Sequence, residues 1–388
     1  MTTPAKLSTS GFVPRLSAFY AAYFVLIGIQ LPFFPVWLAA KGLDAAQIGL
    51  ILAAPAFVRV VAVPALTRIA DRYGALRETL MAAAIAAAAG YIAIGFTEGA
   101  LAILLAVTVA SIAHTPIVAL SDALALKGLK VHGGSYGNIR LWGSTAFIAA
   151  NLGAGLLLDL IQPVQLIWAI AASAVLAALV SLQLETVQAE APRAIDAPPA
   201  APLWRDPPFL AVIAAAGLIQ ASHALYYGFS TIDWKAAGFD GVTIGLLWAL
   251  GVVAEIILFA LSGRLPPWLT PHALLLIGAA GGIIRWSVMA FGPPSWSLPL
   301  LQCLHAATFG ATHLGLIGYI ARHAPERFAA TAQGYFAVLS GVLLGISMGL
   351  AGVLYERYAA AGYTGMALTA ALGGLVVIVA RARWRPEA

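Results

Sequence analysis

Long uninterrupted apolar segments dominate this chain and limit the folds open to it. Several exceed 18 residues, the length typical of a helix that crosses a bilayer. Only 10% of the residues are charged and 61% belong to the set AVILMFWYC, so a soluble globule of this size would lack a charged exterior. A soluble enzyme, a disordered chain and a disulfide scaffold are therefore excluded. The first segment is too long for a signal-peptide core, and we interpret it as a retained helix.

The number of apolar segments predicts an all-α membrane protein with twelve transmembrane helices. No stretch shows the alternation of apolar and polar residues that is typical of outer-membrane strands. The predicted spans are 16–38, 46–69, 78–97, 100–125, 138–160, 163–184, 208–234, 241–263, 272–292, 296–321, 329–355 and 362–380.

The basic residues predict the orientation of these spans. Of the 21 Lys and Arg residues, sixteen fall on the side of the N-terminus, and only Lys41, Lys235 and Arg357 fall on the other side. Cytoplasmic loops carry the excess of Lys and Arg, so both termini are expected in the cytoplasm of a multi-pass protein of the cell inner membrane. The basic residues form no clustered face, so nucleic acid is not an expected partner.

Two short stretches are repeated at a distance close to half the chain. Residues 42–50 read GLDAAQIGL and residues 238–246 read GFDGVTIGL, 196 positions later. A weaker repeat joins Gly155 and Asp159 to Gly352 and Glu356, 197 positions later. The stretches 42–50 and 238–246 each lead into the second span of their half. This pattern predicts two pseudo-symmetric bundles of six helices, related by an axis along the membrane normal.

The repeat also predicts the domain boundaries. Residues 1–184 would form the N-terminal bundle and residues 208–388 the C-terminal bundle. Residues 185–207 between them are rich in Glu, Pro and Ala and are expected to form an irregular cytoplasmic linker without a chemical role.

Three ionisable residues, Arg59, Glu255 and Arg285, lie within predicted spans. Each would cost about 2.5–3.5 kcal/mol at the centre of a membrane helix, so each is expected to be paired or hydrated. Arg59 and Glu255 are 196 positions apart and occupy equivalent places in the two halves. One interpretation is a structural charge pair between Arg59 and Glu255. The other makes Glu255 a proton carrier whose protonation changes with conformation.

Histidines of the second half are further candidates for proton coupling or substrate binding. His223, Tyr226 and Tyr227 share one helix face, while His305 and His313 lie about 80° apart around one helix and can line the same cavity. The alternative for each is a neutral histidine bonded to a backbone carbonyl. No metal site is expected, because the histidines lie on different helices without a supporting cluster of Cys or carboxylates.

In the first half, Asp122 and Arg140 lie near the facing ends of two successive spans. They can pin the two helices together, or the guanidinium can bind a carboxylate or hydroxyl group of a substrate. Tyr23 and Gln30 share a face of the first span and can add stacking and a hydrogen bond. All four are therefore candidate substrate-binding residues.

The turn Asp71-Arg72-x-Gly74-x-x-Arg77 resembles the loop signature of the major facilitator superfamily, with Thr67 in place of its usual leading Gly. We expect this loop to hold or release a cytoplasmic gate. Three further stretches resemble the 3-phenylpropionate permease family, relatives of the lactose/proton symporters, and the likeness runs over nearly the whole chain. They are Tyr136-Gly137-x-x-Arg140-Leu141-Trp142-Gly143-Ser144, Gln220-Ala221-x-His223-Ala224-x-Tyr226-Tyr227-Gly228-Phe229-Ser230 and Leu250-Gly251-Val252-Val253-Ala254-Glu255.

The resemblance implies roles for several of these residues. In lactose permease a carboxylate and an Arg bind the sugar, and these positions correspond to Asp122 and Arg140. Its proton-coupling residues correspond to Glu255, Arg285 and one of His305 or His313. This chain lacks the acidic residue that lactose permease carries on span ten. The family name implies an aromatic carboxylic acid as substrate.

Together these features predict a proton-coupled symporter of a small organic solute that works by alternating access. Protons are the expected coupling ion without any cofactor, and the expected partners are a small-molecule substrate and the lipid bilayer, with the protein a monomer. A sugar or nucleoside symporter and an efflux antiporter on the same fold remain alternatives. A membrane-embedded enzyme or receptor is disfavoured, because no Ser/His/Asp, zinc-ligand or phosphate-loop constellation occurs.

Overall fold

The computed structural model describes residues 11–187, 203–324 and 328–383, and these residues form helices and short connections. The predicted all-helical class is confirmed. The first series of helices is α1 (Phe12–Ala40), α2 (Ala45–Tyr73), α3 (Leu76–Gly95), α4 (Ala100–His114), α5 (Ile117–His132), α6 (Tyr136–Leu160) and α7 (Leu166–Ser181). The second is α8 (Pro207–Ala221), α9 (Ala224–Ala236), α10 (Gly241–Leu261), α11 (Pro271–Ala290), α12 (Leu298–Cys303), α13 (Thr312–His323), α14 (Ala329–Tyr358) and α15 (Tyr363–Arg383).

Within these described ranges, eleven segments are long and apolar enough to cross a membrane. The last of them, Thr331–Ala380, covers α14 and α15 together with the turn that joins them. The predicted linker 185–207 lies largely outside the described residues, which omit 188–202.

Three of the predicted spans are interrupted helices. The span 100–125 breaks at Thr115 and Pro116, since proline has no amide hydrogen to continue the helical ladder. The span 208–234 breaks at Ser222 and His223, where the Ser222 hydroxyl donates to the carbonyl of Ile219. The span 296–321 contains a π-helical segment, η5 (Ala306–Ala311), between α12 and α13. Such π-bulges are frequent at functional sites.

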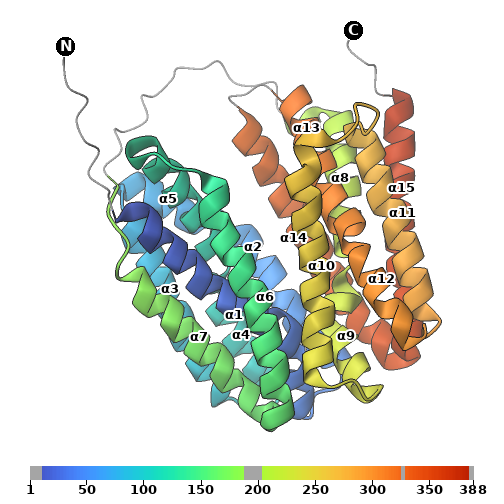
Figure 1. Ribbon diagram of the computed structural model, residues 1–388, viewed down its shortest axis with the longest axis horizontal. Coiled ribbons are helices and arrows are strands. Elements are labelled where there is room, and N and C mark those ends of the chain that lie inside the picture. The colour runs from blue at the N-terminus through green and yellow to red at the C-terminus, as the bar shows by residue number, and fades with distance from the viewer. Residues whose placement is uncertain (1–10, 188–202, 325–327, 384–388) are drawn as a thin grey trace.

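The helices form two groups that lie side by side (Figure 1). The first helical group comprises α1–α7 and the second helical group comprises α8–α15. The groups diverge at the upper end of the view, where α1 begins and α15 ends, and converge at the lower end. Contacts between the groups involve mainly α2 with α14 and α6 with α10.

At the end where the two helical groups converge, the copy of one repeat in each group contacts the copy of the other repeat in the opposite group. The Asp159 carboxylate of α6 accepts hydrogen bonds from the amide of Gly241, at 2.8 and 2.9 Å, where α10 begins. In the symmetric contact, the Glu356 carboxylate of α14 accepts from the amide of Ala46 at 3.1 Å, where α2 begins. Each carboxylate therefore neutralises the positive end of a helix dipole in the other group. We call these two contacts the gate contacts.

Glycines allow the backbones to approach at the gate contacts. A methyl group added at Gly155 would overlap the backbone of Gly241, and one added at Gly49 would overlap the backbone of Gly352. Since the obstacle is backbone rather than a movable side chain, any larger residue at Gly155 or Gly49 must separate the two helical groups.

The loop predicted to act as a cytoplasmic gate is tied to its own group. Gly74 ends α2 in a left-handed conformation with φ of 60°. Asp71 lies 3.4 Å from the ammonium of Lys127 on α5. The Arg77 guanidinium donates to the backbone carbonyls of Leu184 and Leu182 beyond α7. Arg72 lies over the ring of Tyr73. These contacts all stay within the first helical group.

Candidate functional site

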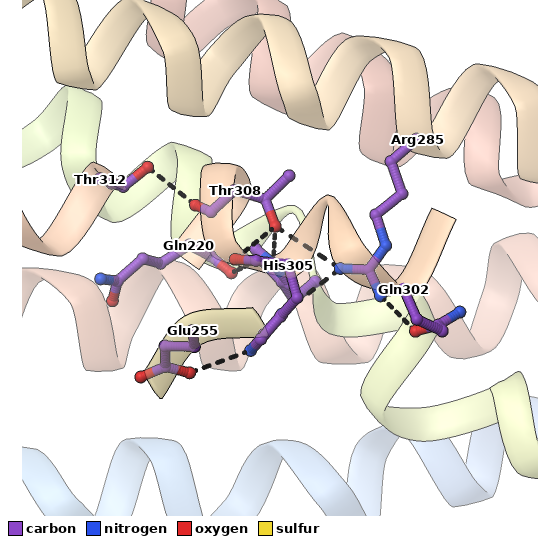
Figure 2. Close-up of polar contacts among 8 residues, drawn as sticks. Gln220, Glu255, Arg285, Gln302, His305, Thr308 and Thr312 are labelled. Atoms are coloured by element: carbon purple, nitrogen blue, oxygen red, sulfur yellow. Dashed lines mark hydrogen bonds and ion pairs between the residues drawn. The ribbon is translucent and has the colours of Figure 1, made fainter. Parts of the chain in front are cut away.

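A chain of polar contacts crosses the interior of the second helical group (Figure 2). Oε2 of Glu255 on α10 lies 3.4 Å from Nε2 of His305. Nδ1 of His305 lies 3.3 Å from Nη1 of Arg285 on α11, whose Nη2 donates to Oε1 of Gln302 at 2.6 Å. Arg285 and Gln302 have no exposed surface, and His305 is buried. The structure therefore brings together Glu255, Arg285 and His305, which the sequence placed on three different spans.

The contacts of His305 determine which of its ring nitrogens carries the proton. A guanidinium has only donors, so Nδ1 of His305 must accept from Arg285. In the neutral ring Nε2 then carries the hydrogen and faces the Glu255 carboxylate at 3.4 Å. His305 thus bridges the Arg285 guanidinium and the Glu255 carboxylate by its two opposite ring nitrogens. Because a guanidinium does not release its proton, proton exchange in this contact is confined to Nε2 of His305 and Glu255.

Thr308 of the π-helical segment joins a second histidine to this chain. Its hydroxyl lies 2.9 Å from Nε2 of His223 and 3.5 Å from Nη1 of Arg285. Nδ1 of His223 donates to the backbone carbonyl of Gln220 at 3.0 Å, so Nε2 accepts from Thr308. The interruptions in spans seven and ten therefore place their polar side chains against each other.

Aromatic rings surround the charged groups. The Arg285 guanidinium lies 4.6 Å from the ring centroids of both Tyr226 and Trp286, a cation–π arrangement that offsets part of the cost of burying its charge. The rings of His305, Phe309 and His313 stack in a column, with centroid separations of 5.4 Å and then 6.3 Å. His313 also interacts electrostatically with Glu255.

The first helical group holds a smaller polar cluster. Asp122 on α5 accepts hydrogen bonds from the hydroxyls of Tyr20 and Tyr136, the latter at 2.9 Å, and lies 4.0 Å from Nη1 of Arg140. The Arg140 guanidinium lies 4.6 Å from the centroid of the Phe24 ring. Arg140 also interacts electrostatically with Glu255 and His313 across the boundary between the groups. The two predicted charge clusters are thus adjacent.

Replacing Asp122 with asparagine is expected to lower the unfolding midpoint of the purified protein by a few degrees. The variant loses an ionised acceptor for two hydroxyls and the counter-charge of Arg140, worth about 1–2 kcal/mol at a site that is partly exposed. A thermal unfolding scan measures this, with Arg140→Gln and the double variant completing a cycle. Strictly additive losses in the cycle would contradict the coupling between Asp122 and Arg140.

Two candidate substrate-binding residues point into the first helical group. The Tyr23 hydroxyl donates to the backbone carbonyl of His114 at 3.1 Å, and Gln30 lines a small cavity beside His114. His114 itself was not singled out from the sequence, although Pro116 two residues later signals the break in its helix. Gln302 and Thr308 were missed because uncharged polar residues within an apolar segment carry no distinctive pattern.

The structure does not form the predicted charge pair between Arg59 and Glu255. Within the described residues, Glu255 contacts His305, and Arg59 forms no ion pair. The repeat makes these positions equivalent, but equivalence under a two-fold axis does not imply contact. Arg59 instead has an exposed side chain that lines a cavity of about 150 Å³ between the two groups, together with Tyr227.

Comparison with known proteins identifies the family. Residues 13–363 match the MFS_1-like family. The chain belongs to this family. It is 33% identical over 363 residues to a probable 3-phenylpropionic acid transporter of Escherichia coli (strain K12), covering 90% of this chain and 93% of the relative. It is 30% identical over 375 residues to a maltose permease of Geobacillus stearothermophilus, covering 95% and 94%.

A solved structure of a point mutant of the nucleoside transporter NupG has the same fold. It superposes with a TM-score of 0.82 at 17% identity, covering 96% of this chain and all of NupG. At this identity the likeness establishes the fold alone. Membership of the family and the 33% identical relative make this chain a multi-pass membrane transporter and not an enzyme, and the family match confirms the predicted relation to the major facilitator superfamily.

Proposed function

We propose that this transporter is a proton-coupled symporter of a small organic solute. The observation that carries the proposal is the contact chain from the partly buried Glu255 through His305 to the buried Arg285, beside a cavity between the two helical groups. A partly buried carboxylate in contact with a histidine is suited to take up and release one proton in each cycle.

The charges around Glu255 link its proton to the movement of the two groups. His305 and His313 face it from span ten, Tyr227 faces it from α9, and Arg140 faces it from the first helical group. While Glu255 is ionised, its attraction to Arg140 holds the groups in their present arrangement. Protonation removes that attraction and so shifts the equilibrium toward the other arrangement of the two groups about the central cavity, as alternating access requires.

The proposal includes the arrangement of the chain in the membrane. α14 and α15 each cross the membrane, which gives twelve spans in two bundles, with residues 1–184 and 208–388 as domains. The excess of Lys and Arg puts both termini in the cytoplasm of an inner-membrane protein that acts as a monomer. The groups diverge at the cytoplasmic end in this arrangement, so the structure corresponds to the inward-facing state, with the gate contacts closing the outside (Figure 1).

Relatives named for 3-phenylpropionic acid and maltose set the candidate solutes, and aromatic carboxylic acids are the first of them. The test is uptake into proteoliposomes of labelled acids, sugars and nucleosides, with and without an imposed pH gradient. Accumulation of one solute that depends on the gradient and disappears with a protonophore is expected. Uptake that ignores the gradient would overturn proton coupling, and gradient-driven expulsion would make the protein an antiporter.

A further inference from the structure

The cavity between the two helical groups is lined by polar and aromatic side chains from both of them. Arg59 on α2 comes from the first group. Gln220 on α8, Tyr227 on α9, Phe309 of the π-helical segment and Ser340 on α14 come from the second. Its volume of about 150 Å³ is comparable to that of a cavity that binds benzene in another protein. The cavity therefore admits one ring-sized ligand that touches both groups at once.

Arg59 is the distinctive feature of this cavity. Arg285, which also lies within a predicted span, has partners in Gln302 and His305, and Arg140 lies 4.0 Å from the carboxylate of Asp122. In the described part of the chain, Arg59 forms no ion pair or hydrogen bond, and it interacts electrostatically with Tyr23. A cation at membrane depth without a counter-charge costs free energy, unless water or a ligand anion neutralises it. Its side chain is exposed to this cavity, where such an anion can reach it.

The other side chains that line the cavity indicate which chemical groups the ligand carries besides its anion. Tyr227 and Phe309 present aromatic rings on which a planar apolar group can stack. Ser340 and Gln220 add short polar groups, from α14 and α8. A guanidinium fork matches the two oxygens of a carboxylate better than the hydroxyls of a neutral sugar.

We propose that Arg59 binds the carboxylate of a small aromatic monocarboxylate, whose ring lies against Tyr227 and Phe309. This assignment rests on the proposed function, since it places the transported solute in the central cavity. It also differs from the roles implied for Asp122 and Arg140, which lie 4.0 Å from each other and do not line this cavity.

The site lies next to the proposed proton carrier. Phe309 stacks on His305 with a centroid separation of 5.4 Å, and Tyr227 interacts electrostatically with Glu255. A ring that contacts Phe309 and Tyr227 therefore touches one side chain that packs on His305 and one that interacts with Glu255. Binding of the solute and protonation can influence each other through these two rings.

The experiment is equilibrium binding to the purified protein by calorimetry, without a pH gradient. The probes are 3-phenylpropionate, its uncharged amide and propionate, which keeps the carboxylate without the ring. The variants are Arg59→Gln, Arg59→Lys and the matched control Arg68→Gln, an exposed arginine further along the same helix. Size-exclusion profiles and unfolding midpoints verify that each variant is folded.

The wild type and Arg68→Gln are expected to bind 3-phenylpropionate, with the amide and propionate weaker. Loss of the charged fork in Arg59→Gln should weaken 3-phenylpropionate binding about tenfold or more and remove the preference for acid over amide. Arg59→Lys should keep that preference at intermediate affinity, since it keeps the charge without the fork. Unchanged affinity in a folded Arg59→Gln variant overturns the site.

Outcomes for this site and for proton coupling are distinguishable. Binding that depends on Arg59, without any gradient-driven accumulation, supports the site and contradicts the proposed symport. Gradient-driven accumulation of a sugar or nucleoside, with no binding of 3-phenylpropionate, overturns the carboxylate site and leaves proton coupling intact.

Discussion

Replacing Glu255 with glutamine is expected to abolish solute accumulation driven by a pH gradient, while exchange of solute between the two sides of the membrane continues. One pH unit stores about 1.4 kcal/mol per proton, enough to support about a tenfold solute gradient in a one-proton symporter. Glutamine keeps the shape and a polar contact for His305 but cannot carry a proton. The solute should therefore equilibrate at a concentration ratio of one.

The measurement uses proteoliposomes with an alkaline interior, and exchange of labelled solute against unlabelled solute serves as the second readout. Glu98→Gln is a matched control, since Glu98 forms an exposed ion pair with Lys41 outside the polar network. It should keep wild-type accumulation. Gradient-driven accumulation by the Glu255 variant would show that another group carries the proton.

Replacing Gly155 with tryptophan is expected to stop transport by preventing closure at the gate contacts. A side chain at position 155 meets the backbone of Gly241, which cannot move aside as a flexible side chain would. Overpacking of this kind costs about 1–3 kcal/mol, which shifts a two-state equilibrium about 5–150-fold toward the state in which the contact is open. Uptake should fall accordingly, while solute binding persists because residue 155 does not line the cavity.

The matched control is Gly153→Trp on the same helix, where an added side chain meets open space. It should transport as the wild type does. Labelling of Ser340→Cys in a Cys303→Ser background gives a second readout, since Ser340 lines the central cavity. An impermeant thiol reagent should reach this cysteine from the outside more readily when Gly155→Trp is present. Equal labelling from the outside with and without Gly155→Trp would contradict the role assigned to the gate contacts.

The helices themselves could be predicted from the sequence because lipid offers no partner for backbone amides and carbonyls. An apolar segment of sufficient length must therefore be helical, whatever surrounds it. The interruptions could not be predicted in this way. The segment 296–321 has the same apolar character before and after its π-helical part, and the extra residue in one turn depends on packing around Thr308 and Thr312. Pro116 was the one local signal, and it lies in a different span.

Some residues of the candidate site could be predicted from the sequence, and others could not. Glu255 and Arg285 stand out in the sequence because charges are rare in apolar segments, and the structure places both in the polar network. Their partners Gln302 and Thr308 do not stand out. Arg59 was paired with Glu255 through the repeat, yet it faces the cavity, because the relative placement of the two groups decides contacts across their boundary.

The crosswise meeting of the repeats is a final example. The sequence by itself determined that 42–50 and 238–246 are equivalent, and that 155–159 and 352–356 are equivalent. Only the tertiary structure decided that 155–159 contacts 238–246 and that 352–356 contacts 42–50, in each case across the boundary between the two helical groups. Hydropathy and backbone hydrogen bonding act along the chain, and can be evaluated from neighbouring residues. Contacts between a carboxylate and a distant helix end depend on how two bundles pack, a property of all their surfaces together.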